Sequence, residues 1–447
     1  MTPRLKKGGL LAAMLLTLLT ISYAFNLIPF TVKRSTRNTH TGCTPEHHVC
    51  VMKTMFNLED GAVPIKRIST AELPTEVKAS INAGAAWLAK AQSPEGGWGA
   101  GMYTRQDIRD PHAVAADPAT TSLVCLALLR TGNSLTSGTY QKELIKAIEF
   151  LLKAVEQWSE NQPRLTILSG TQPQRKLGDN IDAILTVQYF TNLLKYHPQH
   201  PGKERIEKAL QKCVRRIEQE QDTDGGWKGG GWAPVLQSAL ADHALESAKD
   251  AGIAVDTMVM KKSKGYQKSN FDTATKSAIT GKAAGVMLYS LSSTTRSSAQ
   301  EAKKAKEWVE KGKKEGKLTE HEGISEVALE KAGASPAEAK ELVTAYLINE
   351  NTKKQSVRED VMQGFGSNGG EELISYLMTG EAILMQGNAA EWKQWYETMS
   401  KKVMAIQQQD GSWEGHHCIT SPVFCTAAAL LILSINNDLD LSIPKQF

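Results

Sequence analysis

The sequence predicts an all-α chain built from about six helix pairs. Three observations about its repeats support this prediction. Three segments share the order of an amphipathic helix, a glycine-containing turn and a tryptophan, at Trp98, Trp227 and Trp413. The first two tryptophans are 129 residues apart (227 minus 98) and the last two are 186 apart (413 minus 227), about two and three times one unit. A second apolar segment of helical length follows each turn.

The composition is that of a large folded body. The chain has 447 residues, 41% hydrophobic and 22% charged, which is enough to bury a substantial core. Its 52 Lys and Arg against 48 Asp and Glu leave a net charge of only +4. We therefore expect no concentrated basic surface and no nucleic-acid partner. Six cysteines are too few to replace a hydrophobic core.

Residues 1–31 predict a signal segment or a membrane anchor. Basic residues precede an uncharged run from Gly8 to Phe30, and about 20 apolar residues suffice to span a bilayer as a helix. We favour the anchor, although Ser22 and Ala24 also provide the small residues of a cleavage site. In both cases the body is expected on the extracytoplasmic (periplasmic) side, either held to the membrane by the N-terminal helix or secreted to that side.

Residues 32–75 are polar and irregular and predict a tether. Within the tether, Cys43 and Cys50 flank His47 and His48. In an oxidising compartment we favour a Cys43–Cys50 disulfide. A metal site formed by these four residues is the alternative, although their spacing matches no standard zinc module.

The helix pairs are expected between residues 76 and 437, followed by a tail at 438–447. At the end of the first helix of each repeated unit, Gln92, Gln221 and Gln409 are expected to hydrogen-bond the carbonyls left open at the helix end, and the tryptophan is expected to pack over the turn. Asp117 and Ser421, each followed by proline, predict the start of a second helix. The Lys-rich stretch at about 260–335 is either a peripheral insertion or a set of eroded repeats.

The three turns from Gln92 to Trp98, Gln221 to Trp227 and Gln409 to Trp413 resemble the QW-type repeats of the prenyltransferase and squalene-cyclase superfamily. They span most of residues 76–437. The resemblance implies an α/α toroid, in which outer helices surround inner helices and enclose a central cavity. It also implies that residues just after each turn line the cavity mouth.

Polar and aromatic residues at the expected starts of inner helices are therefore our ligand-binding candidates. They are Asn180, Trp232, Gln237, Glu371, Glu372, Tyr376, His416 and His417.

Two kinds of catalytic centre would be expected from the resemblance. The cyclases of the superfamily use an Asp-rich acid motif, which is missing here, and Asp117, Asp179 and Asp182 are only weak substitutes. For these residues helix capping or a turn is the favoured role.

The protein prenyltransferases of the superfamily bind zinc through Asp, Cys and His. This chain offers a partial set after the last turn: His416, His417, Cys418 and Cys425. The partner segment with Asp and Cys is absent, so no cofactor is favoured and zinc is the alternative. We favour a Cys418–Cys425 disulfide over a metal site.

The sequence predicts a cell-envelope protein whose body is a non-catalytic module that binds an extended ligand or an envelope protein partner. Two alternatives stay open. One is an enzyme acting on an isoprenoid or lipid, either a divergent terpene cyclase or a zinc prenyltransferase-like protein. The other is a structural component of an envelope complex. The low aromatic content of 6% disfavours the carbocation-stabilising lining of a cyclase.

Overall fold

The computed structural model describes residues 73–436, apart from 160, 198–199, 228 and 230. The predicted anchor, residues 32–72 of the predicted tether with its Cys43–Cys50 pair, and the tail at 438–447 lie outside the described residues, and Thr75, the last residue assigned to the tether, begins the first described helix. Within the described ranges, no helix combines the length and the apolar character that a membrane span requires.

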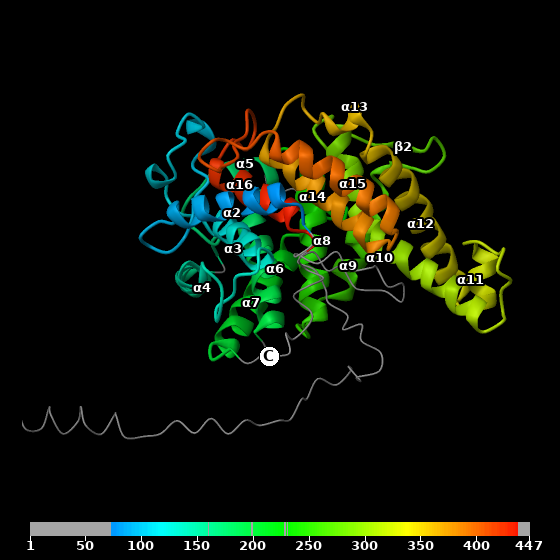
Figure 1. Ribbon diagram of the computed structural model, residues 1–447. Helices are drawn as coiled ribbons and strands as arrows, with labels where there is room; N and C mark the ends of the chain where they lie inside the picture. The colour runs from blue at the N-terminus through cyan, green and yellow to red at the C-terminus, as the bar shows by residue number, and fades with distance from the viewer. Residues whose placement is uncertain (1–72, 160, 198–199, 228, 230, 437–447) are drawn as a thin grey trace, which may run out of the picture. The chain divides into compact units, whose positions relative to one another are not determined.

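The described part of the chain is mostly helical, which confirms the all-α prediction. Figure 1 shows the arrangement of the helices. In chain order they are α2 (Thr75–Lys90), α3 (Pro118–Arg130), α4 (Gln141–Gln157), α5 (Gln172–Leu177), α6 (Ile181–Tyr196), α7 (Lys203–Gln219), α8 (Pro234–Asp250), α9 (Thr257–Lys268), α10 (Met287–Lys314), α11 (Glu326–Ala332), α12 (Pro336–Ser356), α13 (Glu359–Met362), α14 (Gly370–Met385), α15 (Ala389–Met404) and α16 (Pro422–Leu433). A small antiparallel hairpin, β1 (Phe271–Asp272) and β2 (Ser277–Ala278), lies between α9 and α10.

The long helices differ in how they are buried. Every residue of α3, α14 and α16 is buried. In contrast, α7 buries only one stripe, formed by Ile206, Leu210, Val214, Ile217 and their neighbours on that face. A stripe of this kind is the pattern of a helix that covers a core, whereas burial on all sides requires neighbours all round. We call the two kinds outer and inner helices.

The inner helices contact one another in a cyclic order. Helix α3 packs on α6, α6 on α8, α8 on α10, α10 on α14, α14 on α16, and α16 packs on α3 again. Each inner helix is also covered by an outer one: α4 covers α3, α7 covers α6, α9 covers α8, α12 covers α10, α15 covers α14, and α2 covers α16. The contacts of the described helices therefore return to their starting point.

The three tryptophan corners share one geometry. The indole Nε1 of each tryptophan donates to a carbonyl near the end of the preceding outer helix, at 2.7 Å in every case: Trp98 to Leu88, Trp227 to Ile217 and Trp413 to Val403. The backbone N–H of each tryptophan donates to a hydroxyl of the following inner helix, on Thr121, Ser238 and Thr426. Each corner thus ties an outer helix to the inner helix that follows it in the chain.

A glycine with positive φ makes each corner turn. The φ angles are 94° at Gly96, 91° at Gly225 and 94° at Gly411, a region that side chains other than glycine rarely adopt. A Cβ atom at these positions would also lie 2.7, 2.3 and 2.8 Å from a backbone carbonyl oxygen of a neighbouring outer helix. Both the backbone conformation and the close approach require glycine.

The corner glutamine bonds to the turn and to the next outer helix. Gln92 Nε2 donates to the carbonyl of Gly96 at 2.8 Å and to that of Glu143 in α4 at 2.9 Å. Gln221 does the same with Gly225 at 3.1 Å and with Val259 in α9 at 2.8 Å. In both corners the glutamine lies four residues before the glycine.

In the third corner this role belongs to Gln407, so the prediction of Gln409 was wrong by two residues. Gln407 Nε2 donates to the carbonyls of Gly411 at 2.9 Å and Ser80 at 3.1 Å, while Gln409 is exposed. Three consecutive glutamines hide the register, and only the spacing to the glycine distinguishes them. Because Ser80 belongs to α2, this corner joins the last outer helix to the first.

Replacing Gln407 with alanine is expected to lower the free energy of unfolding by about 1–3 kcal/mol, because its three hydrogen bonds, including the one that its Oε1 accepts from the Ser80 hydroxyl, are lost and two carbonyls lose a partner. Gln409→Ala is the matched control and should change stability by less than about 0.5 kcal/mol. Urea denaturation of the two variants measures the difference. Equal losses in both would refute the assignment of the corner.

The Lys-rich stretch forms α9, the hairpin, α10 and α11. The first half of α10 is buried among the inner helices, from Leu288 to Ala299. Its second half packs with α11 and α12 in a separate apolar cluster that includes Val309, Leu318 and Leu329. The lysines in the second half of α10 and in α11 therefore lie on helices that pack in an apolar cluster separate from the main core.

Candidate functional site

Side chains from the starts of four inner helices meet in one cluster. Glu371 and Glu372 occupy the first turn of α14 and are 1% and 0% exposed. Around them lie residues of α5, the segment before α8, α10, the segment before α14 and the segment before α16. The members of what we call the Glu371–Glu372 cluster are Lys176, Trp232, Tyr289, Phe365, Glu371, Glu372 and His417.

Glu372 connects three parts of the chain. Its Oε1 accepts a hydrogen bond from the Tyr289 hydroxyl of α10 at 2.5 Å and another from the backbone N–H of Phe365 at 3.2 Å. Its Oε2 lies 3.8 Å from Nε2 of His417, and that nitrogen is also 3.0 Å from the carbonyl of Ser367. The carboxyl is therefore held in position between α10, the loop before α14 and the segment before α16.

Glu371 is the more strongly perturbed acid. Its Oε2 accepts a hydrogen bond from the backbone N–H of Ile419 at 3.0 Å. Burial and the adjacent charge of Glu372 raise the pKa of Glu371 to about 8. Burial also raises the pKa of Glu372. Because desolvation and like charge both oppose ionisation, the pair carries less than its full negative charge near neutral pH.

Aromatic rings form the outer part of the cluster. The ring of Phe365 lies 5.7 Å from that of Trp232 and 5.4 Å from that of His417, measured between centroids. Trp232 is 43% exposed and Phe365 52% exposed. The ammonium of Lys176 lies 3.8 Å from the Trp232 ring centroid, within the range of a cation–π contact. Exposed aromatic rings beside buried polar groups are typical of a recognition surface.

Two cysteines lie close to the cluster, and both are free thiols. The predicted Cys418–Cys425 disulfide is therefore absent from this structure. Cys425 lies inside α16 and its Sγ contacts the Ile419 carbonyl at 3.5 Å, whereas Cys418 adopts a left-handed backbone with φ of 60° beside Lys176. Burial raises the pKa of Cys418 to about 12, so it is a thiol at neutral pH and a poor nucleophile.

Of the eight predicted ligand-binding residues, four meet in the cluster: Trp232, Glu371, Glu372 and His417. The other four have contacts of their own. Gln237 accepts from the Asn180 backbone N–H at 3.1 Å and donates to the Trp227 carbonyl at 2.6 Å, so these two residues support the second corner.

Tyr376 and His416 hold the loop before α14. The Tyr376 hydroxyl donates to the carbonyl of Met362. The His416 backbone N–H donates to the Asn368 carbonyl at 2.7 Å, while its side chain is exposed. These two residues therefore position the segments that carry Phe365 and His417.

Asp117, Asp179 and Asp182 have structural partners. Asp117 caps α3 and accepts from the backbone N–H groups of Thr120 at 2.8 Å and Ala100 at 2.9 Å. Asp179 pairs with Arg164 at 3.2 Å and its side chain is 38% exposed.

Asp182 is buried and accepts from Nε2 of Gln174 at 2.8 Å. Burial and the charge of Asp117 raise its pKa to about 7.

No group of three or more His, Cys, Asp or Glu side chains placed to hold a metal occurs in the part of the chain that the structure describes. His416, the alternative zinc ligand, turns its side chain to solvent, and Cys425 contacts a backbone carbonyl. The described residues of this segment therefore do not gather as a ligand set.

Sequence reasoning missed three members of the cluster: Lys176, Tyr289 and Phe365. Phe365 stands between two glycines before an inner helix, a signal that could have identified it. Lys176 and Tyr289 lie within helices without any local signal, because only tertiary packing brings α5 and α10 to the start of α14.

The chain matches no protein-family model, and no curated protein matches its sequence significantly.

Proposed function

We propose that the body of this chain is an α/α toroid that acts as a non-catalytic binding module of the cell envelope. The toroid is supported by the cyclic order of the inner-helix contacts and by the Gln407 bond that joins α15 to α2. The envelope location is supported by the basic and apolar character of residues 1–31.

The Glu371–Glu372 cluster is the proposed binding site, and one observation carries this proposal. Two exposed aromatic rings, Trp232 and Phe365, lie in edge-to-face contact next to a buried pair of carboxyl groups. The rings offer apolar area at low entropic cost. The carboxyl pair and His417 offer hydrogen-bonding groups for an extended polar ligand, so we propose a peptide segment of an envelope protein as the ligand.

The interior of the inner helices favours this function over an isoprenoid cyclase. Arg130 of α3 pairs with Glu381 of α14 at 2.6 Å, and the hydroxyls of Ser122 and Thr186 are 3.1 Å apart between α3 and α6. A carbocation reaction needs an aromatic, apolar lining and a strong acid. The pKa of Glu371, raised to about 8 by burial and Glu372, makes this carboxyl a weak acid.

A photo-crosslinking amino acid at position 365 tests the proposal in membranes that contain the full-length chain. Phe365 is 52% exposed and Ile167, at 91%, is the matched exposed control. We expect a peptide adduct at position 365 that is absent at position 167 and that decreases at least tenfold in the Trp232→Ala background. An isoprenoid or lipid adduct would support the enzyme alternative, and equal adducts at the two positions would refute a site at the cluster.

A further inference from the structure

A cavity lies between the outer helices α12 and α15, and none of its lining residues belongs to the Glu371–Glu372 cluster. Its volume is ≈ 270 Å³. Its walls combine five apolar residues, Val357, Met362, Ile383, Trp395 and Met399, with five polar or charged ones, Lys353, Lys354, Glu391, Gln394 and Thr398. Small-molecule sites typically combine apolar walls with a few placed polar groups.

Trp395 is held in a fixed position in the wall of this cavity. Its ring stacks on that of Trp392, with centroids 5.3 Å apart and an angle of 28° between the planes. It also packs directly against Gly380 of α14, where a Cβ atom would lie 2.1 Å from the indole. The absence of a side chain at Gly380 therefore makes room for the indole.

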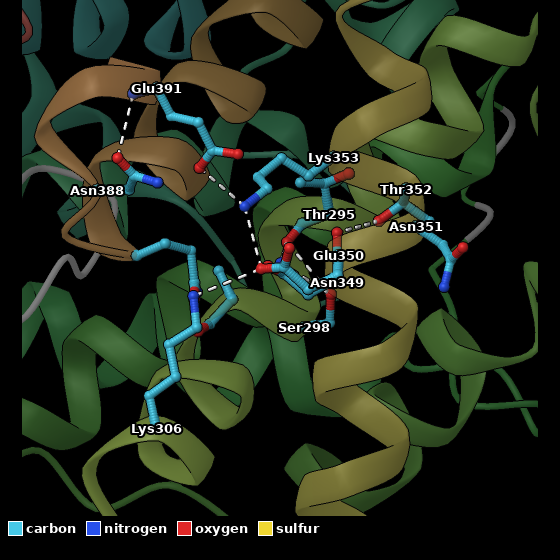
Figure 2. Close-up of polar contacts among 12 residues, drawn as sticks. Thr295, Ser298, Lys306, Asn349, Glu350, Asn351, Thr352, Lys353, Asn388 and Glu391 are labelled. Atoms are coloured by element: carbon cyan, nitrogen blue, oxygen red, sulfur yellow. Dashed lines mark hydrogen bonds and ion pairs between the residues drawn. The ribbon is translucent and has the colours of Figure 1, made fainter. Parts of the chain in front are cut away.

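The charges around the cavity are not balanced. Figure 2 shows Lys353 of α12 between Glu350 and Glu391, and its Nζ lies 3.0 and 2.9 Å from their carboxylate oxygens. Lys306 of α10 also reaches Glu350, at 3.4 Å. Of these four side chains, Lys353 and Glu391 line the cavity, and their charges are paired with each other. The next residue, Lys354, is exposed and has no carboxylate partner in the described ranges, so it adds a positive charge to the cavity rim.

We propose that this cavity binds a small amphipathic carboxylate of the medium-chain fatty acid class. The apolar chain would lie among Met362, Ile383 and Met399. The carboxylate would lie toward Lys354 at the rim of the cavity. The proposal does not depend on the Glu371–Glu372 cluster, because the two sites share no residue.

Calorimetric titration of the full-length protein with decanoate, below its micelle concentration, tests the proposal. We expect saturable binding with one site per chain and a rise in Tm. Decylamine, which has the same chain but the opposite charge, is expected to bind at least tenfold more weakly. Equal binding of the two amphiphiles would overturn the assignment of a carboxylate.

Two variants distinguish binding in the cavity from adsorption at the surface. Val357 is 39% exposed at the rim, so Val357→Trp should block the cavity and reduce affinity at least tenfold while the chain still folds. Lys354→Glu should reduce affinity by a similar factor. Lys393→Glu, an exposed lysine of α15 that does not line the cavity, is the matched control. Unchanged affinity in both rim variants, or no saturable binding, would overturn the proposal.

Discussion

Replacing Glu381 with alanine is expected to lower the free energy of unfolding by about 3–5 kcal/mol, the loss typical when one partner of a buried ion pair is removed. Glu381 Oε1 accepts from Nη2 of Arg130 at 2.6 Å, and its Oε2 lies 3.8 Å from Nε of Arg296. The three side chains are at most 1% exposed. The variant would leave two buried guanidinium groups without this carboxylate.

The position of the triad formed by Arg130, Arg296 and Glu381 explains the size of the expected effect. Arg130 belongs to α3, Arg296 to α10 and Glu381 to α14, and Arg130 also donates to the Leu431 carbonyl of α16 at 3.1 Å. Four of the inner helices are thus tied together by one polar network. A charge buried there cannot reach water without separating the helices, so its desolvation is not recovered.

Urea denaturation of the single variant Glu381→Ala and of the double variant Glu381→Leu/Arg130→Met measures the effect. We expect the double variant to be markedly more stable than the single variant, because one of the two guanidinium groups that lose the Glu381 carboxylate is removed with it. Glu204→Ala breaks an exposed pair with Lys208 and is the control, with an expected change below about 1 kcal/mol. If Glu381→Ala unfolds like this control, the triad does not stabilise the inner helices.

The corners were the part of the fold that could be predicted from the sequence, because their interactions are local. A glutamine, a glycine four residues later and a tryptophan specify one turn, but Gln92 and Gln221 bond the glycine carbonyl of the turn and not the open carbonyls at the helix end. In the third corner the predicted residue was also wrong, because Gln409 was chosen instead of Gln407. Consecutive identical side chains hide the register, and only the four-residue spacing to Gly411 identifies Gln407.

The candidate site could be predicted only in part, for a related reason. Glu371, Glu372 and His417 follow glycine-containing turns, so local sequence identifies Glu371 and Glu372 at the start of α14 and His417 in the segment before α16. Tyr289 has no such signal, because its contact with Glu372 spans 83 residues. The disulfide prediction failed because a short spacing between Cys418 and Cys425 does not determine where the two sulfur atoms point.

Raising the pH from 5 to 8 is expected to destabilise the wild-type chain relative to the Glu371→Gln variant. Burial and the charge of Glu372 raise the pKa of Glu371 from 4.5 to about 8, so the folded state binds this proton more tightly than the unfolded chain. The resulting stability is fully present below the unfolded pKa and is lost as the pH rises toward about 8. The amide keeps the neutral form at every pH.

The difference between the two chains reports on the Glu371–Glu372 pair, because Glu371→Gln also removes the charge beside Glu372. Burial lowers the pKa of His243 well below its ordinary value, which adds an opposite pH dependence, but both chains contain His243. At pH 5 the two stabilities should be similar. At pH 8 the glutamine variant should be the more stable by up to about 4 kcal/mol, since each unit of pKa shift corresponds to about 1.4 kcal/mol.

Urea denaturation of the two chains at pH 5, 6, 7 and 8 provides the measurement, with the exposed Glu326→Gln as the control for losing one carboxyl. A stability difference that grows with pH for Glu371→Gln, while the control follows the wild type, would show that the carboxyl pair is held at an energetic cost. Such a cost is expected where a structure keeps polar groups for recognition and not for stability. Parallel curves for all three chains would mean that Glu371 ionises normally, and the proposed site would lose its main electrostatic feature.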